Sequence, residues 1–117
     1  MLLRIDPASG LPIFEQLAAS VRSELARGTL RGGDRLPGAR EVADALQVNI
    51  HTVLKAYQQL RDEGIIDLRR GRGAVVSESA GVPAALADEA RRLVAHARSA
   101  GVAAPTLLTL IREEYDA

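Results

Sequence analysis

The chain has 117 residues, with 15 basic and 15 acidic side chains and no cysteine. This length fits one domain, or one domain with a small appendage, and the hydrophobic fraction of 47% excludes a disordered protein. The absence of cysteine excludes disulfides, thiolate metal sites and a cysteine nucleophile, and it fits a reducing compartment.

The first third of the sequence predicts an arm, a helix and a loop. Residues 1–12 are expected to be extended. A helix is predicted from Ile13 to the stop at Gly28, because apolar residues recur there at every fourth position. These positions are Ile13, Leu17, Val21 and Leu25. A loop over residues 29–37 follows, with Leu36 as its expected anchor.

The middle of the chain predicts a helix-turn-helix. A short helix is expected over Ala39–Leu46 and a longer one over Ile50–Glu63, with a tight corner at Gln47-Val48. Asn49 is a good N-cap for the second helix, and Gly64 ends it. The second helix has an apolar stripe made of Val53, Ala56, Tyr57 and Leu60.

A β-hairpin is predicted directly after these helices. Ile65–Arg69 indicates one strand, Arg70–Gly73 a turn, and Ala74–Ser77 the returning strand. Two short helices separated by a corner and followed by a hairpin are typical of a winged helix-turn-helix. The predicted fold class is therefore mostly α with a small β-hairpin.

The tail predicts two more helices after a linker at residues 78–82. They cover about Pro83–Ala100 and the segment from Pro105, with a break at Gly101. The predicted domains are thus 1–77, the winged helix-turn-helix, and 83–117, a two-helix segment that is expected to dimerise because ~35 residues are too few to fold alone. The expected dimer seam consists of Leu86, Leu93, Val94, Leu107, Leu108, Leu110 and Ile111. Alternatively, these side chains pack on their own first domain.

The zero net charge hides an uneven distribution. Residues 30–77 hold eight basic and six acidic groups, so they are +2, whereas residues 78–117 hold four basic and six acidic groups and are −2. The stretch Leu68–Ser77 alone carries +3. Binding to a polyanion depends on such a patch more than on the total. The 14 arginines against one lysine suit phosphate recognition, and equally suit a GC-rich genome.

Several strings of residues match one known family in order and spacing. They are Pro12-Ile13-Phe14-Glu15-Gln16-Leu17, Gly33-Asp34-Arg35-Leu36-Pro37, Arg40-Glu41-Val42-Ala43, Val48-Asn49-Ile50-His51-Thr52-Val53, Glu63-Gly64-Ile65-Ile66 and Arg70-Gly71-Arg72-Gly73. Over residues 6–77 the chain resembles the GntR family of bacterial transcription regulators, and its short tail is similar to that of the YtrA-like subfamily. The resemblance implies a regulator, usually a repressor, that binds an inverted-repeat operator in double-stranded DNA as a homodimer.

The resemblance also implies which residues meet DNA. They are Arg40 before the corner, Asn49, Ile50, His51 and Thr52 on the first turn of the recognition helix, Lys55 further along it, and Arg70, Gly71 and Arg72 at the wing tip. Helical periodicity agrees, because His51 and Lys55 project opposite the core residue Val53. Arginines on a tight glycine turn suit a narrow, negative minor groove. For each charged residue the alternative is a solvated surface charge.

Three positions depart from the family pattern. Gly38 replaces the usual Ser and so lacks a side-chain cap, although Glu41 keeps half of a capping box. Ile50 and Leu54 stand where basic residues are frequent. Isoleucine cannot hydrogen-bond to guanine, but its apolar surface suits the thymine methyl group. Alternatively, Ile50 only buttresses the corner against Val48.

Other function classes have little support in the sequence. We find no nucleophile–base pair and no nucleotide loop, so we expect no enzyme activity and no cofactor, and two distant histidines make a metal site improbable. No apolar run nears ~18 residues and no signal peptide is evident, so we expect a cytoplasmic protein without a membrane partner. The resemblance leaves room for a small-molecule effector of unknown identity. The main alternative function is a winged helix that binds another protein instead of DNA.

Overall fold

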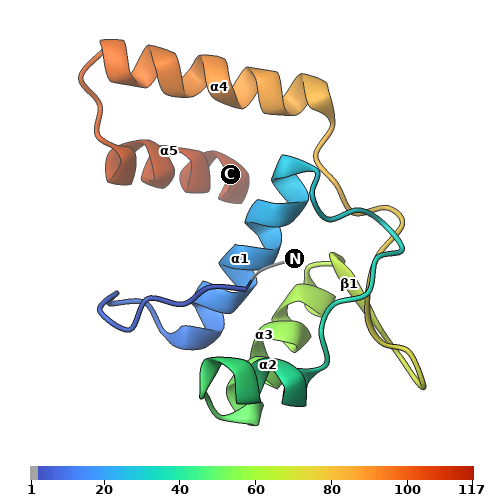
Figure 1. Ribbon diagram of the computed structural model, residues 1–117. Coiled ribbons are helices and arrows are strands. Elements are labelled where there is room, and N and C mark those ends of the chain that lie inside the picture. The colour runs from blue at the N-terminus through green and yellow to red at the C-terminus, as the bar shows by residue number, and fades with distance from the viewer. Residues whose placement is uncertain (1–2) are drawn as a thin grey trace. The chain divides into compact units, whose positions relative to one another are not determined.

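The computed structural model describes residues 3–117, so the first two residues of the predicted arm lie outside the described part. Its elements are α1 (Ile13–Arg27), α2 (Ala39–Leu46), α3 (Ile50–Asp62), β1 (Ile66–Arg69), β2 (Gly73–Val76), α4 (Ala84–Ser99) and α5 (Ala104–Asp116) (Figure 1). The chain divides into a first unit that extends to Val82 and a second unit, Pro83–Ala117. Helices with one antiparallel hairpin confirm the predicted fold class.

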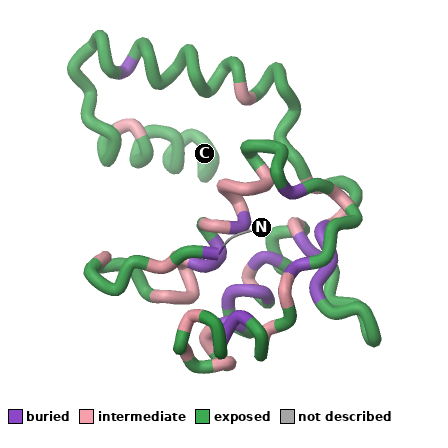
Figure 2. Tube along the Cα trace, in the orientation of Figure 1, coloured by how far each residue is buried: buried purple, intermediate pink, exposed green. Residues whose placement is uncertain are grey.

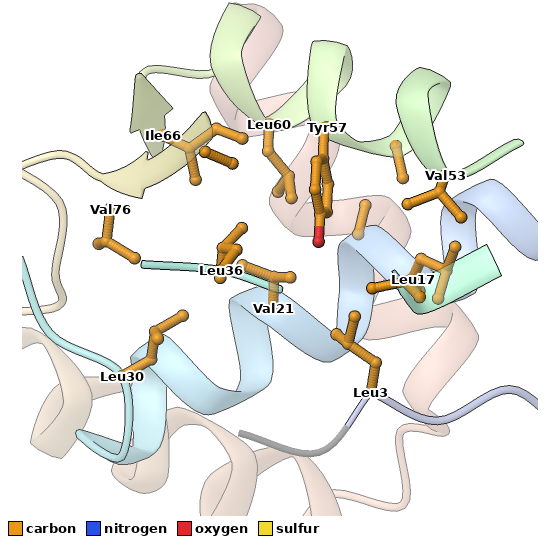
Figure 3. Packing of buried hydrophobic residues seen from close by; sticks show 14 of the residues in the cluster. Leu3, Leu17, Val21, Leu30, Leu36, Val53, Tyr57, Leu60, Ile66 and Val76 are labelled. Carbon is orange, nitrogen blue, oxygen red and sulfur yellow. The ribbon is translucent and has the colours of Figure 1, made fainter. Parts of the chain in front are cut away.

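Helix α3 is the centre of the first unit. Its predicted apolar stripe is confirmed, since Val53, Ala56, Tyr57 and Leu60 are each at most 3% exposed. The stripe packs against α1, α2 and β1. In Figure 3 the side chains of Val53 and Leu60 lie among residues from α1, the loop and the hairpin.

Helix α1 supplies the opposite wall of this core. Leu17, Ala18 and Val21 are buried and share one face, because residues three and four apart lie side by side on a helix. The helix ends where predicted, at Gly28, whose φ of 78° is left-handed. Glycine adopts this conformation without the Cβ penalty, so its N–H can bond back to the last carbonyls of the helix.

The N-terminal arm packs against α1. Leu3 is only 8% exposed and belongs to the core. The main-chain oxygen of Arg4 accepts a hydrogen bond from Ser20 Oγ at 3.1 Å. The side chain of Gln16 donates to the carbonyls of Asp6 and Leu11 at 3.2 and 2.9 Å. Side chains of the helix thus hold the arm at both ends, but residues 7–11 turn instead of being extended as predicted, and Ser9 N bonds to Asp6 O at 3.0 Å.

The wing contains more than the predicted hairpin. β1 and β2 pair antiparallel from Ile66 opposite Val76 to Arg69 opposite Gly73. The segment before α2, predicted as a plain loop, pairs with the other edge of β2 through a bridge between Arg35 and Val75. Its hydrogen bonds are Leu36 N to Ala74 O at 2.9 Å, Val76 N to Asp34 O at 2.7 Å and Gly33 N to Val76 O at 2.8 Å. This pairing fixes the base of the wing to the chain that leads into α2.

One ion pair links α1 to the end of α3. Arg22 Nε and Nη2 donate to the two carboxylate oxygens of Glu63 at 2.9 and 2.5 Å. The hydrogen bond from Arg22 lowers the pKa of Glu63, and that from Glu63 raises the pKa of Arg22. Both side chains are more than one third exposed, 39% and 35%, so solvent screening limits the pair to about 0.2–1 kcal/mol.

The second unit has little core of its own. α4 and α5 make few contacts with each other, and Ala97 is the one buried residue in this unit. Figure 2 shows both helices almost entirely in the colour of exposed residues. The apolar side chains of α4 and α5 are therefore not covered by one another.

Tyr57 ties α3 to the loop before α2. Its hydroxyl donates a hydrogen bond of 2.6 Å to the carbonyl oxygen of Pro37. Burial, with a smaller contribution from the charge of Glu41, raises the pKa of Tyr57 to about 12. The phenol therefore stays protonated at neutral pH and keeps its donor.

We predict that Tyr57→Phe lowers the free energy of unfolding by about 1–2 kcal/mol, because the Pro37 carbonyl loses its donor. Urea unfolding followed by circular dichroism measures this loss. Tyr115→Phe is the control, since Tyr115 is 88% exposed and should leave stability unchanged. Equal stability of Tyr57→Phe and the unchanged protein would show that this hydrogen bond contributes nothing.

Candidate nucleic-acid interface

The corner before α3 is set by local chemistry. Gln47 ends α2 with a φ of 55°, the left-handed conformation, and its N–H bonds to Ala43 O. Asn49 then caps α3, and its Oδ1 accepts a hydrogen bond of 2.8 Å from the N–H of His51. The predicted N-cap is confirmed. Because Asn49 Oδ1 is used by its own helix, this oxygen is occupied in the DNA-free protein.

The outer face of α3 presents the residues predicted for it. His51 and Lys55 are exposed, and Thr52 is half-buried. The ammonium of Lys55 lies over the ring of Phe14, 4.1 Å from its centroid. The helix thus directs a hydrogen-bonding ring and a cation outward from its first two turns, which is where recognition helices meet base edges and phosphates.

The apolar residues at the start of α3 differ in exposure. Ile50 is half-buried and packs on the core, together with Val48. Leu54, one turn later, is 38% exposed. Part of Ile50 therefore serves the corner, as the alternative interpretation held, and the more accessible apolar surface on this helix belongs to Leu54.

Helix α2 contributes one arginine. Arg40 is exposed, and within residues 3–117 the structure gives it no ion pair. Gly38 begins the helix without a side-chain cap, as its sequence predicts. The half capping box expected from Glu41 is wrong, because no hydrogen bond joins its carboxylate to Gly38 N–H in the described chain. The N-terminus of α2 therefore has no side-chain cap from its N-cap residue, Gly38.

The wing tip is a tight basic turn. Gly71 and Gly73 have φ angles of 81° and 75°, which a side chain would strain, and Arg72 N bonds to Arg69 O at 3.1 Å. Arg69 pairs with Asp67 at 3.4 Å. Arg70 and Arg72 are exposed and have no ion pair among the described residues. Two uncompensated guanidinium groups therefore concentrate positive charge at the tip.

Sequence reasoning missed two residues near these elements. Arg35 is exposed on the segment that pairs with β2, next to the base of the wing. The signal in the sequence is that polar Arg35 alternates with apolar Leu36, because side chains of an extended strand point to opposite faces in turn. In the structure Leu36 is buried. Phe14 contacts Lys55, which lies 41 residues later in the sequence, and no local pattern predicts such a contact.

Two other kinds of functional feature that the described residues could provide are a metal site and a membrane-spanning helix. Within residues 3–117 no group of three or more His, Asp or Glu side chains is placed to hold a metal ion. None of the helices there is both long and apolar enough to cross a membrane. The exposed cations on α2, α3 and the wing remain the feature of the first unit that most directly suggests a partner.

Comparisons with known proteins assign the family. The model of "Bacterial regulatory proteins, gntR family" matches residues 13–76. The HTH-type transcriptional repressor YtrA of Bacillus subtilis is 36% identical over 96% of this chain and 91% of its own. YtrA from Sulfolobus acidocaldarius, a GntR-family transcription factor, is a structural match with a TM-score of 0.60, 33% identity, and coverage of 97% of this chain and 96% of its own.

A third match was solved with DNA. AraR(DBD) in complex with operator ORX1 aligns with a TM-score of 0.56 and 26% identity, covering 64% of this chain and 93% of its own. The predicted resemblance is thereby confirmed, and the comparisons favour DNA binding over the protein-interaction alternative. The chain belongs to the GntR family of bacterial regulatory proteins and is a DNA-binding transcription regulator with a winged helix-turn-helix fold.

Proposed function

We propose that the protein is a repressor that binds an inverted-repeat operator as a homodimer. The observation that carries the DNA contact is the uncompensated wing tip, where Arg70 and Arg72 are exposed in a chain of zero net charge. The Bacillus subtilis relative is named a transcriptional repressor. A gel shift with operator DNA selected from a random pool tests the proposal directly.

The proposed contacts divide by chemistry. Arg40, Arg70 and Arg72 meet phosphates or the minor groove, where a guanidinium fork suits both partners. His51 and Thr52 reach base edges from the first turn of α3, and Lys55 meets a phosphate. Asn49 acts mainly as the cap, and Gly71 allows the wing backbone to approach DNA. Phosphate contacts orient the protein, whereas base contacts select the sequence.

Homodimerisation is supported by the second unit. Leu86, Leu108 and Leu110 are 55%, 59% and 52% exposed. Leu93, Val94 and Ile111 are also exposed, and an apolar hollow is lined by Leu93, Leu107, Leu110 and Ile111. A surface of this kind on a segment too small to fold alone indicates a protein partner. A second copy of the chain is the occupant that an inverted repeat requires, because a two-fold axis in the protein then matches the one in the DNA.

We predict that Arg70→Ala and Arg72→Ala each weaken binding to all DNA sequences alike. Each lost phosphate contact should also lower the slope of log K against log salt by about 0.9. Titrations at several salt concentrations measure both effects. Arg69→Ala is the matched control, with a smaller effect, because Asp67 already pairs with Arg69. A loss restricted to one operator base pair would instead indicate base readout by the wing.

We predict that Leu110→Glu gives a monomer whose affinity for the operator falls at least about 100-fold, since the second half-site no longer binds intramolecularly. Sedimentation equilibrium and gel shifts measure the two quantities. Leu11→Glu is the control, because Leu11 in the first unit is 54% exposed and Leu110 is 52% exposed. Removal of residues 83–117 should have the same effect as Leu110→Glu. A truncated chain that still sediments as a dimer contradicts the proposed seam.

We predict that Ile50 contacts a thymine methyl group in each half-site. Replacing that thymine by uracil removes only the methyl, so affinity should fall about two- to fourfold for the unchanged protein and not at all for Ile50→Ala. Leu54→Ala is the matched control and should retain the loss. If Leu54→Ala abolishes the loss and Ile50→Ala retains it, Leu54 is the reader and Ile50 only supports the corner.

A further inference from the structure

The single lysine of the chain lies over its single phenylalanine. Lys55 Nζ is 4.1 Å from the centroid of the Phe14 ring, so the contact joins the second turn of α3 to the first turn of α1. Phe14 is half-buried and packs on the core, whereas Lys55 is exposed. A side chain fixed by the core therefore provides a platform for one that points to solvent.

An aromatic ring under the ammonium differs from a carboxylate partner because it leaves the charge and most N–H donors of the ammonium free to bind another group. The face of a benzene ring attracts an ammonium through its quadrupole but carries no net charge, so the cation is oriented without being neutralised. No carboxylate forms a salt bridge with Lys55 among the described residues. The N–H donors of the ammonium that face away from the ring remain available for an acceptor in solvent.

The position on α3 indicates which acceptor this is. Lys55 follows His51 by four residues, so the two lie on one face, with Lys55 a turn further from the N-terminal end of the helix. Its contact with Phe14 draws the ammonium toward the α1 side of that face. A compact point charge at the flank of a recognition helix suits a phosphate oxygen better than a base edge.

We propose that Phe14 is a positioning residue, which holds the Lys55 ammonium at the α1–α3 boundary for contact with a DNA phosphate. This inference rests on the proposed DNA contact by α3. A free lysine side chain samples many rotamers, and fixing it on DNA costs conformational entropy. Phe14 removes part of that cost before DNA arrives, so the same phosphate contact forms with higher affinity.

Three variants separate the charge from its positioning. Lys55→Gln removes the charge, so affinity should fall and the salt slope should drop by about 0.9. Phe14→Leu keeps an apolar side chain but removes the ring, so affinity should fall about two- to fivefold with the salt slope unchanged, because the phosphate contact still forms. Phe14→Tyr keeps an aromatic face and should bind like the unchanged protein.

The double variant Phe14→Leu/Lys55→Gln decides between positioning and general packing. If Phe14 acts through Lys55, the double variant binds as Lys55→Gln does. If Phe14→Leu causes the same fold-loss with and without Lys55, its effect is structural and the inference is overturned. Unchanged or stronger binding by Phe14→Leu overturns it too. Urea unfolding of each variant, with affinities compared only between folded samples, accounts for any change in stability.

A measurement without DNA tests the same contact. Protons on the lysine Cε over an aromatic face are shifted upfield by the ring current, and this shift should be present in the unchanged protein and in Phe14→Tyr but lost in Phe14→Leu. Its absence in the unchanged protein would overturn the inference. If the shift is present and no operator DNA binds even the unchanged protein, the proposed function fails while the contact itself stands.

Discussion

The first unit depends on burying one face of α3 while leaving the opposite face bare. Four side chains of that helix, Val53, Ala56, Tyr57 and Leu60, are at most 3% exposed, and α1, α2 and β1 all pack around them. Burial of such side chains stabilises the fold by about 25 cal/mol for each Å² of apolar surface removed from water. The core therefore sets the rotation of the helix, and this rotation decides that His51 and Lys55 point outward.

The contacts around this core couple the parts that meet DNA. Tyr57 holds the Pro37 carbonyl at the entrance to α2, and the preceding residues pair with β2. The recognition helix, the start of α2 and the base of the wing are thus joined through one short segment, residues 34–37. Backbone hydrogen bonds of this segment connect the base of the wing to the chain that enters α2. This connection suits a protein that must present several contacts at once.

The electrostatics of the protein are local. With equal numbers of acidic and basic groups, the net charge of the chain contributes no attraction to DNA. Arg40, Arg70 and Arg72 are among the cations without a carboxylate partner in the described residues, and they lie on α2 and the wing, inside the segment that matches the family. The second unit differs from the first because its exposed leucines form an apolar surface. Such a surface favours association with another protein.

Local patterns in the sequence were sufficient to predict much of the protein. The apolar stripe of α3, the Asn49 cap, the Gly28 stop and the basic turn at Arg70–Arg72 all follow from spacings of a few residues, and the structure confirms each. The motif strings over residues 6–77 identified the family for the same reason. Only the tertiary structure revealed the pairing of Arg35 with Val75, the place of Leu3 in the core and the contact of Lys55 with Phe14. These features join positions far apart in sequence, so they depend on how the helices pack, which no local periodicity encodes.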